Sequence, residues 1–341
     1  MSAMRLSRSI VGEAEARAVA RVLLEDGYLG MGAEVRRFEE ELAAYLGVKP
    51  AQVVTTNSGT AALHLAVDAA GCAVKDGRPE VLVPSLTFVA SFQAISAAGC
   101  RPVACDALPE TGTLDLEDAA RRLTPRTIAV MPVHYASNPW QLEEVYAFAR
   151  RHGLRVIEDA AHAFGCLRHG RKIGSFGDVV CFSFDGIKNI TCGEGGCMVS
   201  FDPEVVRLAS DARLLSVEND AQKRFSGTRS WDPDVKRQGW RYHMSNIMAA
   251  VGRVQLGRLD KEFAPARRDL AALYAQRLSP LKGLHLFATD PQDYIVPHIL
   301  PVCVREGRKD QVVRVLADRG IPTGVHYKPN HLLSFFGGGK P

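Results

Sequence analysis

Long apolar runs are missing from this sequence. A bilayer-spanning helix needs about 20 consecutive apolar residues, and no stretch approaches that length. The N-terminal residues Met1–Arg5 lead into no apolar segment of the kind that signal peptides carry. We therefore expect a cytoplasmic protein without a membrane partner.

Cysteine patterns with a chemical function are missing too. The chain has eight cysteines, but none forms a Cys-x-x-Cys pair and none lies at zinc-ligand spacing from a histidine. Several lie within apolar runs, as Cys181 does in Val179–Phe182. The pattern favours small buried side chains in a reducing compartment, and no metal site is expected.

A strong excess of one charge is also absent. The 42 basic and 38 acidic residues leave a net charge of only +4. This charge fits an anionic small-molecule substrate and is too small to indicate nucleic acid as a partner. The length of 341 residues and the 46% hydrophobic content predict a soluble globular protein of about two domains.

A regular alternation of two patterns fills the first two thirds of the chain. Short apolar runs typical of strands lie at Val53–Val54, Val81–Val83, Pro102–Cys105, Ile128–Val133, Val156–Ile157, Val179–Phe184 and Gly196–Ser200. Helical patterns lie at Ala33–Leu46, Thr60–Ala70, Ser91–Ala98, Leu116–Leu123 and Leu142–Arg151. Such alternation predicts an α/β fold with a mostly parallel central sheet flanked by helices.

The pattern changes after about residue 200. Longer helical patterns lie at Glu204–Leu215, Ile247–Leu259 and Ala266–Leu278, and a second strand–helix pair lies at Ile295–Val304 and Gln311–Arg319. The segment Glu218–Gly239 lacks periodicity and predicts a long ordered loop, because its aromatic residues Phe225 and Trp231 and the adjacent Trp240 need packing partners. We expect a large α/β domain at residues 1–250 and a smaller C-terminal α/β domain at residues 251–341.

A first polar signal follows the predicted strand at Val53–Val54. Small and hydroxylated residues, Thr55–Thr60, lead directly into a helix. Backbone N–H groups and the helix dipole favour an anion there, especially a phosphate. Gly59 would allow close approach and Thr60 would add a hydroxyl, although an ordinary N-cap role explains Ser58 equally well.

A second signal is the acidic pair Glu158 and Asp159, which ends another predicted strand. Ligands of open α/β sheets bind at the carboxyl ends of strands. A carboxylate there could keep the ring nitrogen of a cofactor protonated, which makes the ring an electron sink. A solvated strand end or an N-cap is an equally good explanation, and Asp159 alone is also compatible with a ribose or a metal.

A third signal, Phe182–Asn189, follows a buried strand. Most lysines are solvated, but Lys188 beside a pocket would have a lowered pKa and could attack a carbonyl, and Ser183 is placed to donate to a phosphate. A phosphate cradle, a carboxylate and this lysine together predict a pyridoxal-phosphate (PLP) enzyme with a Schiff base on Lys188. A nicotinamide-dependent dehydrogenase is the main alternative, but Gly27–Gly32 follows a helix where a dinucleotide fingerprint would follow a strand.

These signals and their neighbours resemble the DegT-type family of nucleotide-sugar aminotransferases, which are fold-type-I PLP-dependent transferases. The resemblance covers nearly the whole chain, and the order and spacing of its motifs make it specific. The motifs are Asn57–His64, Pro84–Val89, Pro132–Tyr135, Glu158–His162, Gly174–Asp178, Lys188–Asn189 and Gly193–Gly196.

The resemblance implies a role for each matching residue. Lys188 would carry PLP and then shuttle a proton between the substrate carbon and the cofactor carbon. Asp159 would pair with the pyridine nitrogen, and His162 would lie near the 3-oxygen. Phe88 would stack on the ring, although core packing would explain it without the resemblance. Phosphate contacts are implied for Ser58, Gly59, Thr60 and Ser183.

The family also implies a homodimer with shared active sites. Its usual donor segment reads Gly-aromatic-Asn-Tyr-Arg-Met-Ser, and this chain has Gly239–Ser245 there. Arg241 replaces the asparagine and His243 replaces the arginine. Because a cation suits a phosphate, Arg241 of a partner chain is a candidate cofactor contact.

Three segments, Pro132–Ala136, Lys188–Cys192 and the motif Thr323–Tyr327, are most similar to the branch that aminates C4 of UDP-linked 4-keto sugars. They imply amino transfer from glutamate to a nucleotide-linked keto sugar, for cell-surface polysaccharide, lipopolysaccharide or glycoside biosynthesis. His326 and His331 would lie on the substrate side, although surface histidines explain them nearly as well. Alternatives are amination at C3 of a dTDP-linked 3-keto-6-deoxyhexose and a non-catalytic sensor. Family members continue beyond Pro341, so the small domain is expected to be truncated.

Overall fold

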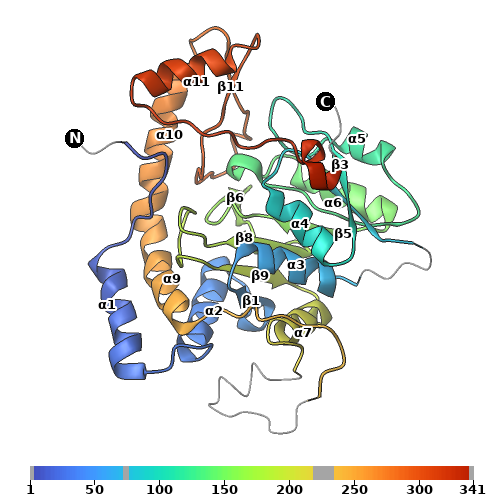
Figure 1. Ribbon diagram of the computed structural model, residues 1–341, viewed down its shortest axis with the longest axis vertical. Coiled ribbons are helices and arrows are strands. Elements are labelled where there is room, and N and C mark those ends of the chain that lie inside the picture. Colours follow the sequence, from blue (N-terminus) through green and yellow to red (C-terminus); the bar gives the residue numbers. More distant parts are fainter. Residues whose placement is uncertain (1–3, 72–76, 218–233, 338–341) are drawn as a thin grey trace.

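The computed structural model describes residues 4–71, 77–217 and 234–337 and is built around a seven-stranded sheet (Figure 1). The strand order is β1-β9-β8-β5-β4-β2-β3. Only β9 runs antiparallel to its neighbours, and the other pairings are parallel. The strands are β1 (Val53–Thr56), β2 (Glu80–Pro84), β3 (Arg101–Cys105), β4 (Thr127–Val130), β5 (Arg155–Asp159), β8 (Val179–Ser183) and β9 (Gly196–Ser200).

Helices cover both faces of this sheet (Figure 1). One face packs against α2 (Ala33–Leu46), α5 (Leu116–Arg121), α6 (Leu142–His152) and α9 (Asn246–Arg258). The other packs against α3 (Gly59–Ala69), α4 (Val89–Ala97) and α7 (Pro203–Ala212). Successive strand residues alternate between the faces, so that Val180 and Phe182 point one way while Val179 and Cys181 point the other. The predicted α/β fold is confirmed.

The remaining N-terminal and hairpin elements are short. They are α1 (Glu13–Arg21), the π-turn Val22–Asp26, the 3-10 turns Pro50–Gln52 and Tyr135–Ser137, and the hairpin β6 (Leu167–Arg168) and β7 (Arg171–Lys172). Among the helices that the structure describes, none is both long enough and apolar enough to cross a membrane.

The C-terminal third is built differently. The chain continues from α9 through a π-turn at Leu259–Phe263 into α10 (Ala264–Leu278), so residue 250 lies within a continuous helical stretch. The hairpin β10 (Leu284–Leu286) and β11 (Val302–Val304) and the helix α11 (Lys309–Asp318) follow, together with 3-10 turns at Asn330–Leu332 and Ser334–Phe336. The division of the chain into domains at residue 250 stays a prediction.

Three predicted elements lose three or more residues at one end, each for a local reason. The strand at Ile128–Val133 ends at Val130, before Pro132, and only Val302–Val304 of the run Ile295–Val304 pairs, after Pro301. Proline has no N–H to donate to a strand ladder. Helix α7 ends at Ala212, and it cannot continue to Leu215 because Leu215 adopts a left-handed φ of 67°.

The predicted loop Glu218–Gly239 and the predicted burial of the cysteines can also be compared with the structure. Most of Glu218–Gly239, including Phe225 and Trp231, lies outside the described residues, whereas Trp240 packs 4.4 Å from the ring of His64. Six cysteines are buried, as predicted, while Cys303 is half-buried and Cys72 lies outside the described residues.

Candidate active site

A cavity of about 380 Å³ lies at the ends of the central strands. Its walls come from the residues that follow β1, β2, β4, β5 and β8, and from three residues of the C-terminal third. All predicted site residues except Arg241 and His331 line it, namely Ser58, Gly59, Thr60, Phe88, Asp159, His162, Ser183, Lys188 and His326. The fold therefore brings together groups that are more than 250 residues apart in sequence.

The predicted phosphate cradle is the junction between β1 and α3. Ser58 is the N-cap of α3, since its Oγ accepts a hydrogen bond of 3.1 Å from the N–H of Ala61. Gly59 lies so close to the end of β8 that an added Cβ would be 2.6 Å from Cβ of Ser183. The glycine thus lets the hydroxyl of Ser183 reach the N-terminus of α3, where backbone N–H groups are free to bind an anion.

Asp159 ends β5 and is 5% exposed. Its Oδ1 accepts a hydrogen bond of 3.2 Å from the N–H of Ala161, and its Oδ2 accepts one of 2.6 Å from Oγ of Ser91. The carboxylate is therefore held at both oxygens on the wall of the cavity. Glu158, the other acid of the pair, points to the opposite face, where it binds His134 at 2.8 Å and Tyr146 at 2.6 Å.

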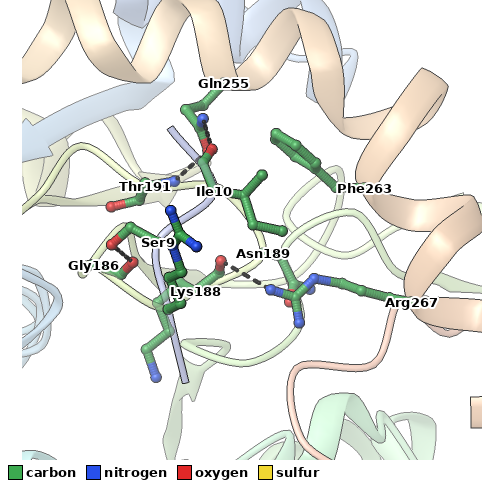
Figure 2. Close-up of a pocket in the computed structure, with 10 residues that line it drawn as sticks. Ser9, Ile10, Gly186, Lys188, Asn189, Thr191, Gln255, Phe263 and Arg267 are labelled. Carbon is green, nitrogen blue, oxygen red and sulfur yellow. Dashed lines mark hydrogen bonds between the residues drawn. The ribbon is translucent and has the colours of Figure 1, made fainter. Parts of the chain in front are cut away.

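Lys188 lies in the loop after β8, between the large cavity and a smaller one behind the loop. Figure 2 shows the smaller cavity. There the hydroxyl of Ser9 donates to the carbonyl of Gly186 at 2.5 Å, and the guanidinium of Arg267 donates to the carbonyl of Lys188 at 3.4 Å. Burial lowers the pKa of the Lys188 amine, against the opposing attraction of Asp159 and Asp185. A lowered pKa makes the neutral, nucleophilic form of the amine more accessible than it is for an exposed lysine.

His162 faces the same cavity with a buried ring. Burial, and next the charge of Lys188, hold the pKa of His162 well below its usual value, so the ring is neutral. Its Nε2 lies 3.2 Å from the hydroxyl of Tyr327, while its buried Nδ1 has no hydrogen-bond partner within the described part of the chain. An unpartnered buried nitrogen on a cavity wall suits a polar group of a bound ligand.

The other predicted residues differ in their placement. Phe88 is 55% exposed, so core packing does not account for it; its ring lies 5.5 Å from that of Tyr327 at the cavity wall. His331 turns away and binds Oγ of Ser85 through Nδ1 at 2.7 Å. Arg241 has an exposed side chain, and its carbonyl accepts a hydrogen bond of 3.2 Å from the amide of Asn57.

Three residues at or next to the cavity have no role in the site that was predicted from the sequence. His298 lies with its Nε2 3.5 Å from Nζ of Lys188 and its ring 4.4 Å from that of His162. Tyr327 lines the cavity beside His326 and could have been inferred from its place in the same motif. The sequence predicts Ser91 only as the first residue of a helix. No local pattern marks His298 or Ser91, because their partners lie 110 and 68 residues away.

Comparisons with known proteins agree with this geometry. The sequence matches the DegT/DnrJ/EryC1/StrS aminotransferase family over residues 10–339. A dTDP-4-dehydro-2,3,6-trideoxy-D-glucose 4-aminotransferase of Saccharopolyspora spinosa is 37% identical over 338 residues, which cover 98% of this chain and 86% of that protein.

Solved structures show the same architecture. The aminotransferase TlmJ from Streptoalloteichus hindustanus has a TM-score of 0.89 and 34% identity, over 98% of this chain and 87% of that one. The PLP form of a protein described as a sugar aminotransferase, from Streptococcus pneumoniae, has a TM-score of 0.87 and 25% identity, over 98% of this chain and 87% of that one. The chain belongs to the DegT/DnrJ/EryC1/StrS aminotransferase family and is a PLP-dependent sugar aminotransferase.

Proposed function

We propose that this enzyme transfers an amino group from glutamate to C4 of a nucleotide-linked 4-keto sugar. One observation carries the proposal: the buried amine of Lys188 shares a cavity with the Asp159 carboxylate and the anion cradle at the start of α3. The position C4 is supported by the name of the Saccharopolyspora spinosa relative. That name also favours a dTDP-linked sugar over the UDP-linked sugar that the motifs suggest.

The cavity suits PLP on the chemistry of its donors. Ser58, Gly59, Thr60 and Ser183 surround the N-terminus of α3, where a dianionic phosphate is favoured. Asp159 offers a fixed carboxylate to a protonated ring nitrogen, and the unpartnered Nδ1 of His162 offers a hydrogen bond to the ring's oxygen substituent. The exposed ring of Phe88 provides an apolar stacking face.

When bound, PLP supplies an electron sink that stabilises negative charge at the substrate carbon. Lys188 moves the proton at Nζ, since its lowered pKa lets the free amine accept a proton as a base. Burial, and next the charges of Lys188 and Arg267, bring the pKa of His298 to about 2. His298 is therefore a neutral hydrogen-bonding partner that keeps the amine in place without adding charge.

The substrate side is formed by the C-terminal third. His326 reaches the cavity, and its carbonyl accepts a hydrogen bond from the hydroxyl of Tyr135. We assign His326 to contacts with the sugar, and His331 to a supporting contact through Ser85. A second copy of the chain would complete the site with Arg241, whose side chain is exposed and does not line the cavity of its own chain. The proposal thus includes a cytoplasmic homodimer.

The direct test is substitution of the lysine. Lys188→Ala should abolish the visible absorption band of the lysine-bound cofactor and reduce turnover by about 10³-fold or more, because it removes the nucleophile and the proton carrier. Lys309→Ala changes an exposed lysine on α11 and should behave as wild type. Wild-type protein without the band in the presence of PLP would refute the proposal.

The substrate is tested by single turnover. Conversion of the PLP form to the pyridoxamine form by glutamate, and its reversal by keto sugars, can be followed by absorbance. The panel should contain dTDP- and UDP-linked 4-keto sugars and a dTDP-linked 3-keto sugar. Reversal by the 3-keto sugar alone would contradict C4 amination, and a formed band without any turnover would favour the sensor role.

A further inference from the structure

A buried chain of hydroxyl groups ends on the carboxylate of Asp159. Ser91, on α4, is 0% exposed and lies with its Oγ 2.6 Å from Oδ2 of Asp159. Oγ1 of Thr87 lies 2.8 Å from the same serine oxygen. A carboxylate can only accept, so Ser91 donates to Asp159 and Thr87 donates to Ser91. The 2.6 Å contact has the length of a charge-assisted hydrogen bond.

The start of this chain is fixed by the C-terminal third. Asn330 is 0% exposed, and its Nδ2 donates to the carbonyl of Thr87 at 2.8 Å and to that of Ser85 at 3.2 Å. The N–H of Asn330 also donates to the carbonyl of Ser85, at 3.0 Å. These contacts fix the backbone that carries the Thr87 hydroxyl. The backbone of Thr87 is therefore held beside Ser91.

We propose that Ser91 is a positioning residue that, oriented by Thr87, fixes the Asp159 carboxylate for its contact with the ring nitrogen of PLP. This inference rests on the proposed function of Asp159. Ser91 does not line the cavity, so it acts through Asp159 and does not touch the ligand itself. With Ala161 binding Oδ1 and Ser91 binding Oδ2, rotation of the carboxylate would break one bond or the other.

Other ionisable groups lie close enough to Asp159 to affect a pH titration of this site. Lys188 faces it from the loop after β8, Tyr327 from the C-terminal third, and Cys181 from β8. Burial, and next the charge of Asp159, raise the pKa of both Tyr327 and Cys181, so both stay neutral at neutral pH. His134 lies on the neighbouring segment but directs its ring to Glu158.

The experiment compares Ser91→Ala with a matched control, Ser200→Ala. Ser200 is likewise 0% exposed, but it lies at the opposite end of β9 and donates to the carbonyl of Asp178 at 2.9 Å. Both proteins are purified with PLP, and the pH midpoint of the visible band and the dissociation constant of PLP by equilibrium dialysis are measured. Thermal unfolding and circular dichroism show whether each protein is folded.

We expect Ser91→Ala to raise the band's midpoint by roughly 0.5–1 pH unit and to weaken PLP binding by about 10-fold, the effect of losing one hydrogen bond to a charged group. A ring nitrogen that is held less firmly carries less positive charge, so the titrating proton is repelled less and leaves at higher pH. Ser200→Ala should keep the wild-type midpoint and dissociation constant.

Thr87→Val guards against a Ser91 variant that fails to fold, because it nearly keeps the side-chain volume and removes the donor to Ser91, at the cost of one hydroxyl on the cavity wall. It should shift the midpoint in the same direction by a smaller amount. A normal band with an unmoved midpoint in Ser91→Ala, or in Thr87→Val where Ser91→Ala does not fold, would overturn this inference alone. Absence of the band in wild-type protein would instead overturn the proposed function on which it rests.

Discussion

The sheet and the C-terminal third hold their site residues in different ways. The strands β2, β8 and β9 are buried at every position; Ser183 ends β8, and Asp159 ends β5, in which only Arg155 is not buried. By contrast, Ala264 is the only buried residue of α10, and α11 has none. Hydrophobic burial therefore holds the site residues of the sheet, whereas those of the C-terminal third depend more on hydrogen bonds.

Several of these hydrogen bonds lie close to the cavity. Arg267 donates to the carbonyls of Pro297 and His298 at 3.1 and 3.3 Å. Oγ of Ser137 accepts from the N–H of His298 at 2.9 Å, and Asn330 binds the segment before α4. Regions secured by few buried contacts open at lower free energy than the core does. We therefore expect the C-terminal side of the cavity to open more readily than the side formed by the sheet.

Three arginines test this difference, because each belongs to a different setting. The largest effect is expected at Arg213, whose side chain is 2% exposed and binds Glu39 at 2.6 Å beneath the end of β1. Arg213→Ala leaves a buried carboxylate without its cation and should lower the free energy of unfolding by about 3–5 kcal/mol. Urea denaturation measures the loss. A change below about 1 kcal/mol would show that the sheet core is not the rigid part.

An intermediate effect on stability, with a larger one on catalysis, is expected at Arg267. Arg267→Met keeps most of the side-chain volume but removes its bonds to the carbonyls of Lys188, Pro297 and His298. Stability should fall by about 1–2 kcal/mol, while kcat/KM should fall by about 10-fold or more, because misplaced reacting groups are costly. Unfolding and steady-state assays are compared. Equal losses of stability in Arg267→Met and Arg213→Ala would break the comparison.

The smallest effect is expected at Arg308, in the C-terminal third. Its guanidinium binds Glu306 at 2.6 Å, but both side chains are more than half exposed. Exposed ion pairs contribute little, so Arg308→Ala should change the free energy of unfolding by about 0.5 kcal/mol or less. Thermal and urea unfolding would reveal it. A loss of unfolding free energy as large as that expected for Arg267→Met would mean that the region around Arg308 is coupled to the core.

Much of the fold and part of the site could be predicted from local sequence. Apolar runs without polar alternation predicted the strands of the covered sheet, and the residues directly after them predicted the positions of Ser58, Asp159 and Lys188. These inferences succeeded because a strand and the turn that follows it are covalent neighbours, so that a short pattern specifies both. Where a proline interrupts an apolar run, the strand is shorter than the run predicts.

Tertiary structure alone decided which distant groups meet at those strand ends. His298, Ser91 and Asn330 carry no local signal, yet they contact Lys188, Asp159 and the backbone at Thr87. It also decided that His331 turns to Ser85, away from the cavity, and that Phe88 is exposed. Such contacts depend on how helices pack on the sheet, and packing is set by the summed burial of many side chains. The sequence by itself determined the chemical groups and their order; the tertiary structure set their distances and burial, and so the lowered pKa of Lys188.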